Sequence, residues 1–317
     1  MVASSPHHAS QFRCTLSKYT ILKPRCSSSL EKDGVVMEEI AKNVFIDTQY
    51  TGIIPAVLRL RDGLVMVDSP LRSDDQQDWW RRVSHLSEDA KQIMVMLDVH
   101  SDRLLSNPSV KFPIVAHENA LEIIHNLPSV PRIPEVKTSA DSEPYDVAQN
   151  LRWAVPDMTY SHDMAIVWDD EPVIVTHQPG GHYAGSWVRY DPAKLIFVGD
   201  SVVLNQPPFL EWCDLERWID ELNWLSSESF KGYKIISGRN GLVRQKSILK
   251  MIDYLTILKE AVDELFASQE REAVMTEVVP NLLKRLNFDR EMTEAYKIRL
   301  TRGLKHVIAQ READVSA

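Results

Sequence analysis

The sequence predicts an α/β fold of layered sheets and helices, followed by a helical C-terminal extension. Short segments rich in β-branched and apolar residues alternate with turn residues such as Asp62-Gly63, which indicates strands. Several apolar strands end in a polar residue, and later segments repeat apolar residues every three to four positions, as helices do. At 317 residues the chain is long enough for one large domain with an appendage.

The N-terminal segment is left out of the predicted fold. Residues 1–30 contain no Asp or Glu, but they contain four basic residues and many serines. This composition is typical of a transit peptide, and a disordered tail is the alternative. We therefore expect a tail over 1–34, one main domain over 35–267 and a helical extension over 268–317.

The first half of the main domain is predicted to begin with strands and a helix. Three segments read as consecutive antiparallel strands: 43–47, 56–61 and 64–68. A helix over 73–86 fits the helix dipole, because acidic residues stand in its first turn and basic residues stand later. Residues 126–147 are rich in Pro, Ser and charge, so we expect a loop there.

Chemistry-bearing residues follow four apolar strands. In layered α/β folds, ligand sites collect where strands hand over to loops, so we expect these residues to converge. The four predicted strands, each given with the residues that come after it, are 93–97 before Asp98 and His100, 172–176 before Gly180-Gly181-His182, 195–198 before Gly199-Asp200, and 234–236 before Gly238-Arg239.

The second half of the chain is predicted to be mainly helical. One apolar face runs over 215–225, with Asp214 as its N-cap, and a second runs over 248–265. The chain keeps a helical character after Ser268. We expect these last helices to pack on the domain or on a partner, which includes a homodimer formed through them.

Composition narrows the function classes. A net charge of −9 argues against a nucleic-acid partner, because phosphate recognition needs clustered Lys and Arg. No apolar run approaches the ~20 residues that span a bilayer, so no membrane partner is expected. The three cysteines form no disulfide framework, which indicates a reducing compartment. A cytoplasmic location is expected, with organelle targeting by residues 1–30 as the alternative.

Five motifs occur in the order found in one known family. The loop 98–103 resembles a two-metal cluster, H-x-H-x-D-H, in which Asp98 and Arg103 replace the first and last histidines. With the other four motifs, it makes the chain resemble the metallo-β-lactamase fold superfamily over about 43–262. This resemblance implies a four-layer αββα sandwich. The other motifs are 65–68, ending in Asp; 179–186, similar to P-G-H-T-x-G-S; 197–200, similar to F-x-G-D; and 237–241, where P-G-H-G is expected.

The resemblance also implies a ligand set for metal. Asp98, His100 and His182 stand at the positions of the first metal, with Asp200 as the bridging ligand. The second metal would use Asp102 and the residues at 103 and 239. Both of these are arginines, which offer no lone pair to a metal. We therefore expect at most one divalent ion, of Zn, Fe or Mn, and the alternative of none stays open.

Charge suggests a reason for the two arginines. Asp98, Asp102 and Asp200 with Arg103 and Arg239 carry a net charge of −1, and one divalent ion would make it +1, as in the family's two-metal site. Our hypothesis is that the guanidinium groups replace the second metal and donate charge-assisted hydrogen bonds to Asp102 and Asp200. The alternative is a set of buried salt bridges that holds an inactive site shut.

These features predict a metallo-hydrolase-like protein that acts, if active, on an ester, thioester or amide-type small molecule. A metal-bound water would be the nucleophile. Asp102, Arg103 and Arg239 are the catalytic candidates, and the arginines could hold an anionic group or stabilise an oxyanion. Two alternatives remain: a catalytically silent protein that binds an anion or a partner, and a mononuclear iron oxidoreductase.

Three further expectations concern the surroundings of the site. Residues 205–212 should overhang it with an apolar wall, or else form a buried loop that anchors the next helix. Asp68 is expected to be structural rather than a ligand. The remaining histidines, among them His117 and His177, are expected to be ordinary surface or core residues.

Overall fold

The computed structural model describes residues 37–50, 52–87, 90–100, 103, 105–106, 112–127 and 152–316. The predicted tail over 1–34, most of the loop predicted over 126–147, and Asp102 lie outside the described residues. Within the described residues, no helix combines the length and the apolar character that a membrane span requires.

The first sheet has seven strands. Its first four strands are antiparallel neighbours, and its last four run parallel to one another. In spatial order it consists of β1 (Glu38–Ala41), β2 (Val44–Ile46), β3 (Ala56–Leu60), β4 (Gly63–Val67), β5 (Lys91–Val95), β7 (Ile114–His117) and β9 (Met158–Tyr160).

The second sheet has six strands, antiparallel except for the β13–β14 pair. In order they are β10 (Asp163–Ile166), β11 (Val173–His177), β12 (Ser186–Tyr190), β13 (Leu195–Gly199), β14 (Lys234–Ser237) and β15 (Gly241–Val243). A separate two-stranded pair joins β6 (Leu105–Ser106) to β8 (Arg152–Trp153). The predicted strands 43–47, 56–61 and 64–68 correspond to β2, β3 and β4.

Six α-helices belong to the described residues, and they lie outside the two sheets. The predicted Asp214 N-cap is confirmed, since its carboxylate accepts the Arg217 N–H. The helices are α1 (Ser73–Ser84), α2 (Asn119–His125), α3 (Leu215–Leu225), α4 (Gln245–Ala267), α5 (Arg271–Leu283) and α6 (Thr293–Ser316).

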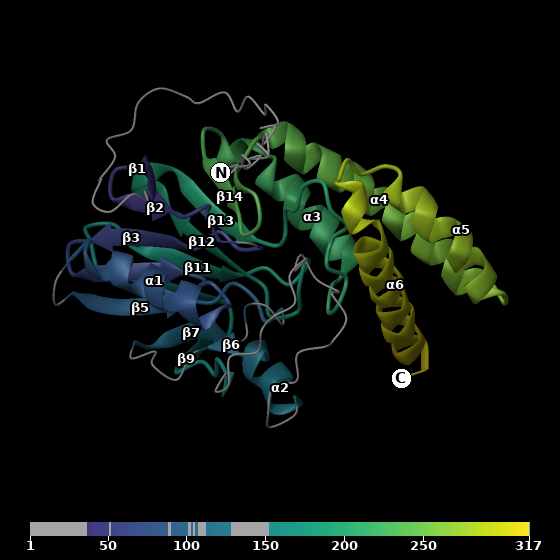
Figure 1. Ribbon diagram of the computed structural model, residues 1–317, viewed down its shortest axis with the longest axis horizontal. Coiled ribbons are helices and arrows are strands. Elements are labelled where there is room, and N and C mark those ends of the chain that lie inside the picture. The colour runs from purple at the N-terminus through teal and green to yellow at the C-terminus, as the bar shows by residue number, and fades with distance from the viewer. Residues whose placement is uncertain are drawn as a thin grey trace, which may run out of the picture.

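The central strands are buried on both faces, and this creates the layers. Side chains alternate along a strand, so the odd and even residues of β4 enter different cores. Val65 packs between the two sheets, whereas Met66 packs against Trp79 of α1. In the second sheet, Phe197 faces the inter-sheet core and Val198 faces α3 and α4. The result is the predicted four-layer αββα sandwich, with α1 and α3 on opposite faces (Figure 1).

The last two helices join the same core as α3 and α4. Met275 of α5 and Leu300 and Leu304 of α6 pack in one apolar cluster with Trp218 of α3 and Leu255 of α4. Figure 1 places α4, α5 and α6 together on one side of the molecule, away from α1. The C-terminal helices are therefore packed on the second sheet's helical layer, which brings α6 close to the edge where the predicted site residues gather.

Candidate metal centre

The topology brings the polar strand ends to one edge of the sandwich. β4 and β5 are parallel, so Asp68 and Asp98, which follow them, lie at the same edge. β13 and β14 are also parallel, which places Asp200 beside Arg239. β12 is antiparallel to β13 and begins at this edge, so the β11–β12 loop with His182 lies there too. The predicted convergence is thus produced by strand direction.

Three side chains meet at distances that suit one metal ion. The Nδ1 atom of His100 lies 2.9 Å from Asp98 Oδ1 and 3.2 Å from Asp200 Oδ2. One ligand atom from each of these residues lies within 4.8 Å of the others, and all three residues are buried. Two carboxylates and one imidazole form a donor set for a divalent ion of Zn, Fe or Mn.

Arg103 occupies the space between the acidic residues. Its guanidinium donates through one terminal nitrogen to Asp68 and through the other to Asp200, and its Nε lies 3.2 Å from Asp98 Oδ1. The chain makes room for it at Gly238, where any Cβ would collide with this guanidinium. Gly238 therefore has to be glycine as long as Arg103 keeps its place.

Arg239 is the second arginine that binds Asp200. Its Nε donates to Asp200 Oδ1 at 2.9 Å and its Nη2 donates to Oδ2 at 2.6 Å, which is the bidentate geometry of a strong ion pair. Its Nη1 donates to the Gly52 carbonyl at 2.7 Å. Both arginines therefore bind Asp200, in the way that our charge hypothesis requires for this residue. The second carboxylate bound by Arg103 is Asp68, which the hypothesis did not include.

Asp68 supports the site through its bonds to Arg103 and to the backbone of Leu97. Its backbone adopts a left-handed φ of 56°, which is uncommon for a residue other than glycine and is often found at functional sites. Its Oδ1 accepts the Leu97 N–H at 3.0 Å, and its other oxygen accepts from Arg103. The expectation of a structural role matches these bonds. A sequence signal for them existed, because Asp68 directly follows a buried strand, as Asp98 and Asp200 do.

His182 lies beside the three convergent residues. Its ring centroid is 4.7 Å from that of His100, and the two planes are nearly perpendicular at 75°. The Nδ1 atom of His182 accepts the Ala184 N–H at 3.0 Å, so the neutral ring carries its proton on Nε2. The group of ligand atoms within 4.8 Å consists of Asp98, His100 and Asp200. His182, the expected fourth ligand, lines the centre without joining this group.

The loop that carries His182 is fixed by α3. The Gly180 N–H donates to both carboxylate oxygens of Glu221 at 3.1 Å, and a Cβ on Gly180 would collide with the backbone of Trp218. Burial raises the pKa of Glu221 to about 7. Sequence reasoning missed Glu221, because it lies 41 positions from Gly180 and looks like an ordinary helix residue.

Buried charges give the two histidines opposite protonation states. Burial alone would lower the pKa of His100, but the carboxylates of Asp98 and Asp200 raise it to about 10. Burial and the neighbouring His100 hold the pKa of His182 well below its ordinary value. Burial would raise the pKa of Asp200, but Arg103 and Arg239 hold it well below its ordinary value. The shifts therefore favour the proton on His100 over His182, and burial also raises the pKa of Asp98, which hydrogen-bonds to His100.

The centre pairs its acidic residues with basic ones. The carboxylates of Asp68 and Asp200 accept from Arg103 and Arg239, and Asp98, whose pKa is raised by burial, hydrogen-bonds to His100. A divalent ion bound by His100 Nδ1 must displace the proton that this nitrogen holds, so metal binding and proton release are linked. Asp98, His100 and Asp200 could hold one metal ion, and the two guanidinium groups have no lone pair to offer a metal.

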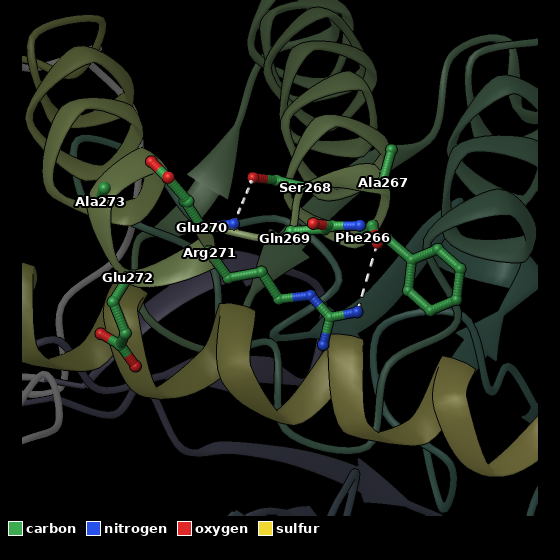
Figure 2. Close-up of a pocket in the computed structure, with 8 residues that line it drawn as sticks. All are labelled: Phe266, Ala267, Ser268, Gln269, Glu270, Arg271, Glu272 and Ala273. Atoms are coloured by element: carbon green, nitrogen blue, oxygen red, sulfur yellow. Dashed lines mark hydrogen bonds between the residues drawn. The ribbon is translucent and has the colours of Figure 1, made fainter.

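One pocket of the described residues lies away from the centre, at the turn between α4 and α5. Its volume is about 730 Å³, and residues 266–273 line it (Figure 2). Two bonds organise this turn: Ser268 Oγ accepts the Glu270 N–H at 3.0 Å, and Arg271 donates to the Phe266 carbonyl at 3.3 Å. None of the candidate metal ligands lines this pocket.

Comparison with known proteins agrees with the layered architecture. No protein-family model matches the chain, and no curated protein matches it significantly. Among solved structures, a metallo-β-lactamase from Pontibacter korlensis is similar with a TM-score of 0.52 and 15% identity, over 69% of this chain and 98% of that one. The metallo-β-lactamase DIM-1, in a crystal exposed to ceftazidime, is similar with a TM-score of 0.52 and 13% identity, over 72% of this chain and 99% of that one. The sandwich described above is therefore the metallo-β-lactamase fold.

Proposed function

We propose that this protein is metallo-hydrolase-like and holds at most one divalent ion, bound by Asp98, His100 and Asp200. The observation that carries the proposal is the convergence of these three donors within 4.8 Å at the edge of the sandwich. A divalent ion supplies Lewis acidity there and lowers the pKa of a water that it binds. The substrate class that we propose is a small ester, thioester or amide.

The protein's own residues have distinct roles in this proposal. Arg103 and Arg239 keep Asp200 ionised and supply fixed positive charge where the fold family places a second ion. In the substrate complex this charge would favour an anionic group or an oxyanion. Asp102 remains our third catalytic candidate from the sequence. His182 offers a neutral ring against His100, which limits the space around the ion.

A second candidate is a catalytically silent protein that binds an anion or a partner. The ion pairs favour it, because Arg103 and Arg239 already match the charges of Asp68 and Asp200 without a metal. A divalent ion bound by Asp200 must compete with these two guanidinium groups. A mononuclear iron oxidoreductase is the third reading of the same donor set, since two carboxylates and an imidazole also suit iron.

Metal analysis separates these candidates. The protein is purified without added metal, analysed for Zn, Fe and Mn, and then titrated with each ion by calorimetry. We expect one ion per chain, and no binding in the Asp98→Asn variant. The control is Asp170→Asn, which changes an exposed carboxylate far from the centre. Two ions per chain would contradict the proposal, whereas no binding of any ion would favour the silent protein. Stoichiometric iron with a reversible redox signal would favour the oxidoreductase.

Restoring the missing imidazoles tests the role assigned to the arginines. In the double variant Arg103→His, Arg239→His we expect the metal content to rise from one to two ions per chain, because both positions regain a lone pair. Each single variant is the control and should bind no more than one. A double variant that folds and still binds one ion would show that the arginines are not what excludes the second.

A further inference from the structure

The segment over the metal centre is stiff, and its last residue is strained. We call residues 205–212, between β13 and α3, the cap segment. Asn205 and Trp212, its first and last residues, adopt left-handed φ values of 59° and 65°. Asparagine adopts such values readily, whereas a bulky side chain such as that of Trp212 is strained there. Pro207 and Pro208 fix the backbone between them. A segment stiffened in this way can move as a unit.

The inner face of the cap segment covers the metal centre. The ring of Phe209 lies 4.9 Å from the ring of His100 and 4.6 Å from the Arg239 guanidinium carbon. The carbonyl of Trp212 accepts the Tyr183 N–H at 2.7 Å, which ties the cap segment to the loop that carries His182. Beneath it, His100 Nε2 is buried and has no hydrogen-bond partner among the described residues. The centre therefore keeps an unsatisfied polar atom under an apolar cover.

The outer face of the cap segment is held by α6. Arg299 of α6 is buried and donates from Nη1 to Gln206 Oε1 at 2.9 Å and to the Pro207 carbonyl at 3.1 Å. Its guanidinium carbon lies 4.3 Å from the centre of the Phe209 ring. Phe209 thus contacts two guanidinium groups, one from the site and one from α6, and each contact stabilises the ring's position.

Other residues of α6 extend this contact along one helix face. Arg302 forms an ion pair with Glu211, and the rings of His306 and Trp212 lie 5.2 Å apart. Gly303 lies so close to the cap segment that an added Cβ would be 2.8 Å from Leu210 Cβ. Positions 299, 302, 303 and 306 are spaced as residues on one face of a helix are. One helix therefore holds nearly the whole length of the cap segment.

Solvent has little access to the described ligands of the centre while the cap segment is in place. The ligands Asp98, His100 and Asp200 are 4%, 7% and 4% exposed. We propose that the cap segment is a gate over the metal centre and that α6 is the latch that keeps the gate closed. What passes the gate, a divalent ion and a small substrate, rests on the proposed function. The opening and closing of the cap segment itself does not rest on the proposed function. Release of α6 would let the strained backbone at Trp212 relax and lift Phe209 from His100.

Hydrogen–deuterium exchange with mass spectrometry tests the latch without any metal. Arg299→Met removes the two bonds to the cap segment while keeping much of the side-chain volume, and Gly303→Ala places a Cβ against Leu210 that forces α6 and the cap segment apart. In both variants we expect amides of 203–212 and of 97–100 to exchange about tenfold faster, as loss of one or two hydrogen bonds to a charged group predicts. Peptides from β3 and β4 should be unchanged.

Arg311→Met is the matched control. Arg311 is also on α6, but it binds Asp263 and stacks on Phe266, both on α4, far along the helix from the cap segment. This variant should leave exchange at 203–212 as in the natural protein. Unchanged exchange at 203–212 in both Arg299→Met and Gly303→Ala would overturn the proposal. Equal acceleration throughout the chain would overturn it too, because Arg299 would then only stabilise the fold.

The rate of metal uptake connects the gate to the site. Apo protein is mixed rapidly with Zn²⁺, and free ion is followed with a chromogenic chelator. We expect faster uptake in Arg299→Met and Gly303→Ala than in the natural protein and Arg311→Met. Equal uptake rates in proteins that do bind Zn²⁺ would overturn the gate. If none of the four proteins binds metal, the proposed function fails, and the exchange experiment alone decides the gate.

Discussion

Within the described part of the chain, two pairs of histidine rings lie in contact, and their surroundings differ. In the metal centre, His100 and His182 meet nearly edge to face at 4.7 Å among carboxylates and guanidinium groups. Between the ends of β7 and β11, His117 and His177 stack in parallel with centroids 3.4 Å apart. In the first pair the pKa of His100 is raised and that of His182 is lowered, whereas burial lowers the pKa of both rings in the second pair.

The difference shows what decides protonation in this fold. The stacked rings are bound by backbone groups. His117 Nε2 donates to the Ser161 carbonyl and its Nδ1 accepts the Asn119 N–H, while His177 Nε2 donates to the Tyr183 carbonyl. Because its Nδ1 accepts one bond while its Nε2 donates the other, the ring of His117 must be neutral. The metal centre instead places two carboxylates at one nitrogen of His100. Buried carboxylates, rather than contact between rings, therefore raise the pKa of a histidine here.

The largest expected effect comes from removing the charge of Asp200, which binds both Arg103 and Arg239. Asp200→Asn leaves Arg103 and Arg239 buried without their shared carboxylate, so we expect a loss of about 3–5 kcal/mol in the free energy of unfolding. Urea unfolding measures it. The control is Asp170→Asn, whose carboxylate pairs with Arg61 at the surface, and we expect it to cost about 0–1 kcal/mol. Equal losses in the two variants would mean that the buried network does not stabilise the fold.

A smaller loss is expected when one arginine is removed. Arg239→Ala breaks the bidentate pair with Asp200 and the bond to the Gly52 carbonyl, while Arg103 still binds Asp200. We expect a loss of roughly 3 kcal/mol in the free energy of unfolding. Arg189→Ala, at a half-exposed ion pair with Asp191, is the control. A change near zero would exclude the hypothesis that the guanidinium replaces a structural cation.

The smallest expected effect is the pH dependence that the stacked rings of His117 and His177 give to the free energy of unfolding. The pKa of His177 is lowered by burial and by the facing His117, although its bond to the Tyr183 carbonyl acts in the other direction. Glu118, His162 and Arg217 are the other ionisable groups that act on the two rings. An unfolded histidine takes up a proton near pH 6.5, whereas the folded rings take it up only at lower pH. Stability from these rings is therefore complete above pH 6.5 and is lost as the pH falls below it.

His177→Gln tests this sign. Glutamine keeps an N–H for the Tyr183 carbonyl but does not titrate. Between pH 7 and pH 5 we expect the free energy of unfolding of the variant to fall less than that of the natural protein, as followed by urea unfolding at each pH. His85→Gln changes a histidine that lies outside the stack and is the control. If the natural protein and His177→Gln have identical pH profiles, the stacked rings do not take up protons on unfolding in the way described.

The fold could be predicted because its signals are local and ordered. Each strand that builds the site can be recognised in the sequence as an apolar run followed by a polar residue, as 195–198 is before Gly199-Asp200. Since parallel strands end at the same edge, the meeting of Asp98, His100, Asp200, Arg103 and Arg239 followed from topology. The roles of these residues remain a prediction, and Asp102 lies outside the described residues.

What could not be predicted depends on contacts between distant segments. The stack of His117 on His177 joins residues 60 positions apart on different sheets, and nothing near either residue marks it. The contact of Arg299 with Phe209 is of the same kind. Residues 205–212 were expected either to wall the site or to form a buried loop. They do both, since Phe209 lies against the ring of His100 while the buried Leu210 packs in the apolar cluster of the C-terminal helices.

The ion pairs of the centre have a mechanical consequence. Asp68 and Arg103 belong to segments that follow strands of the first sheet, whereas Asp200 and Arg239 follow strands of the second. The bonds from Arg103 to both aspartates therefore fasten the two sheets together at one edge of the sandwich, in addition to the apolar core between them. Mobile ions screen surface charges but reach buried ones poorly. This fastening should resist separation of the sheets equally well in dilute buffer and in concentrated salt.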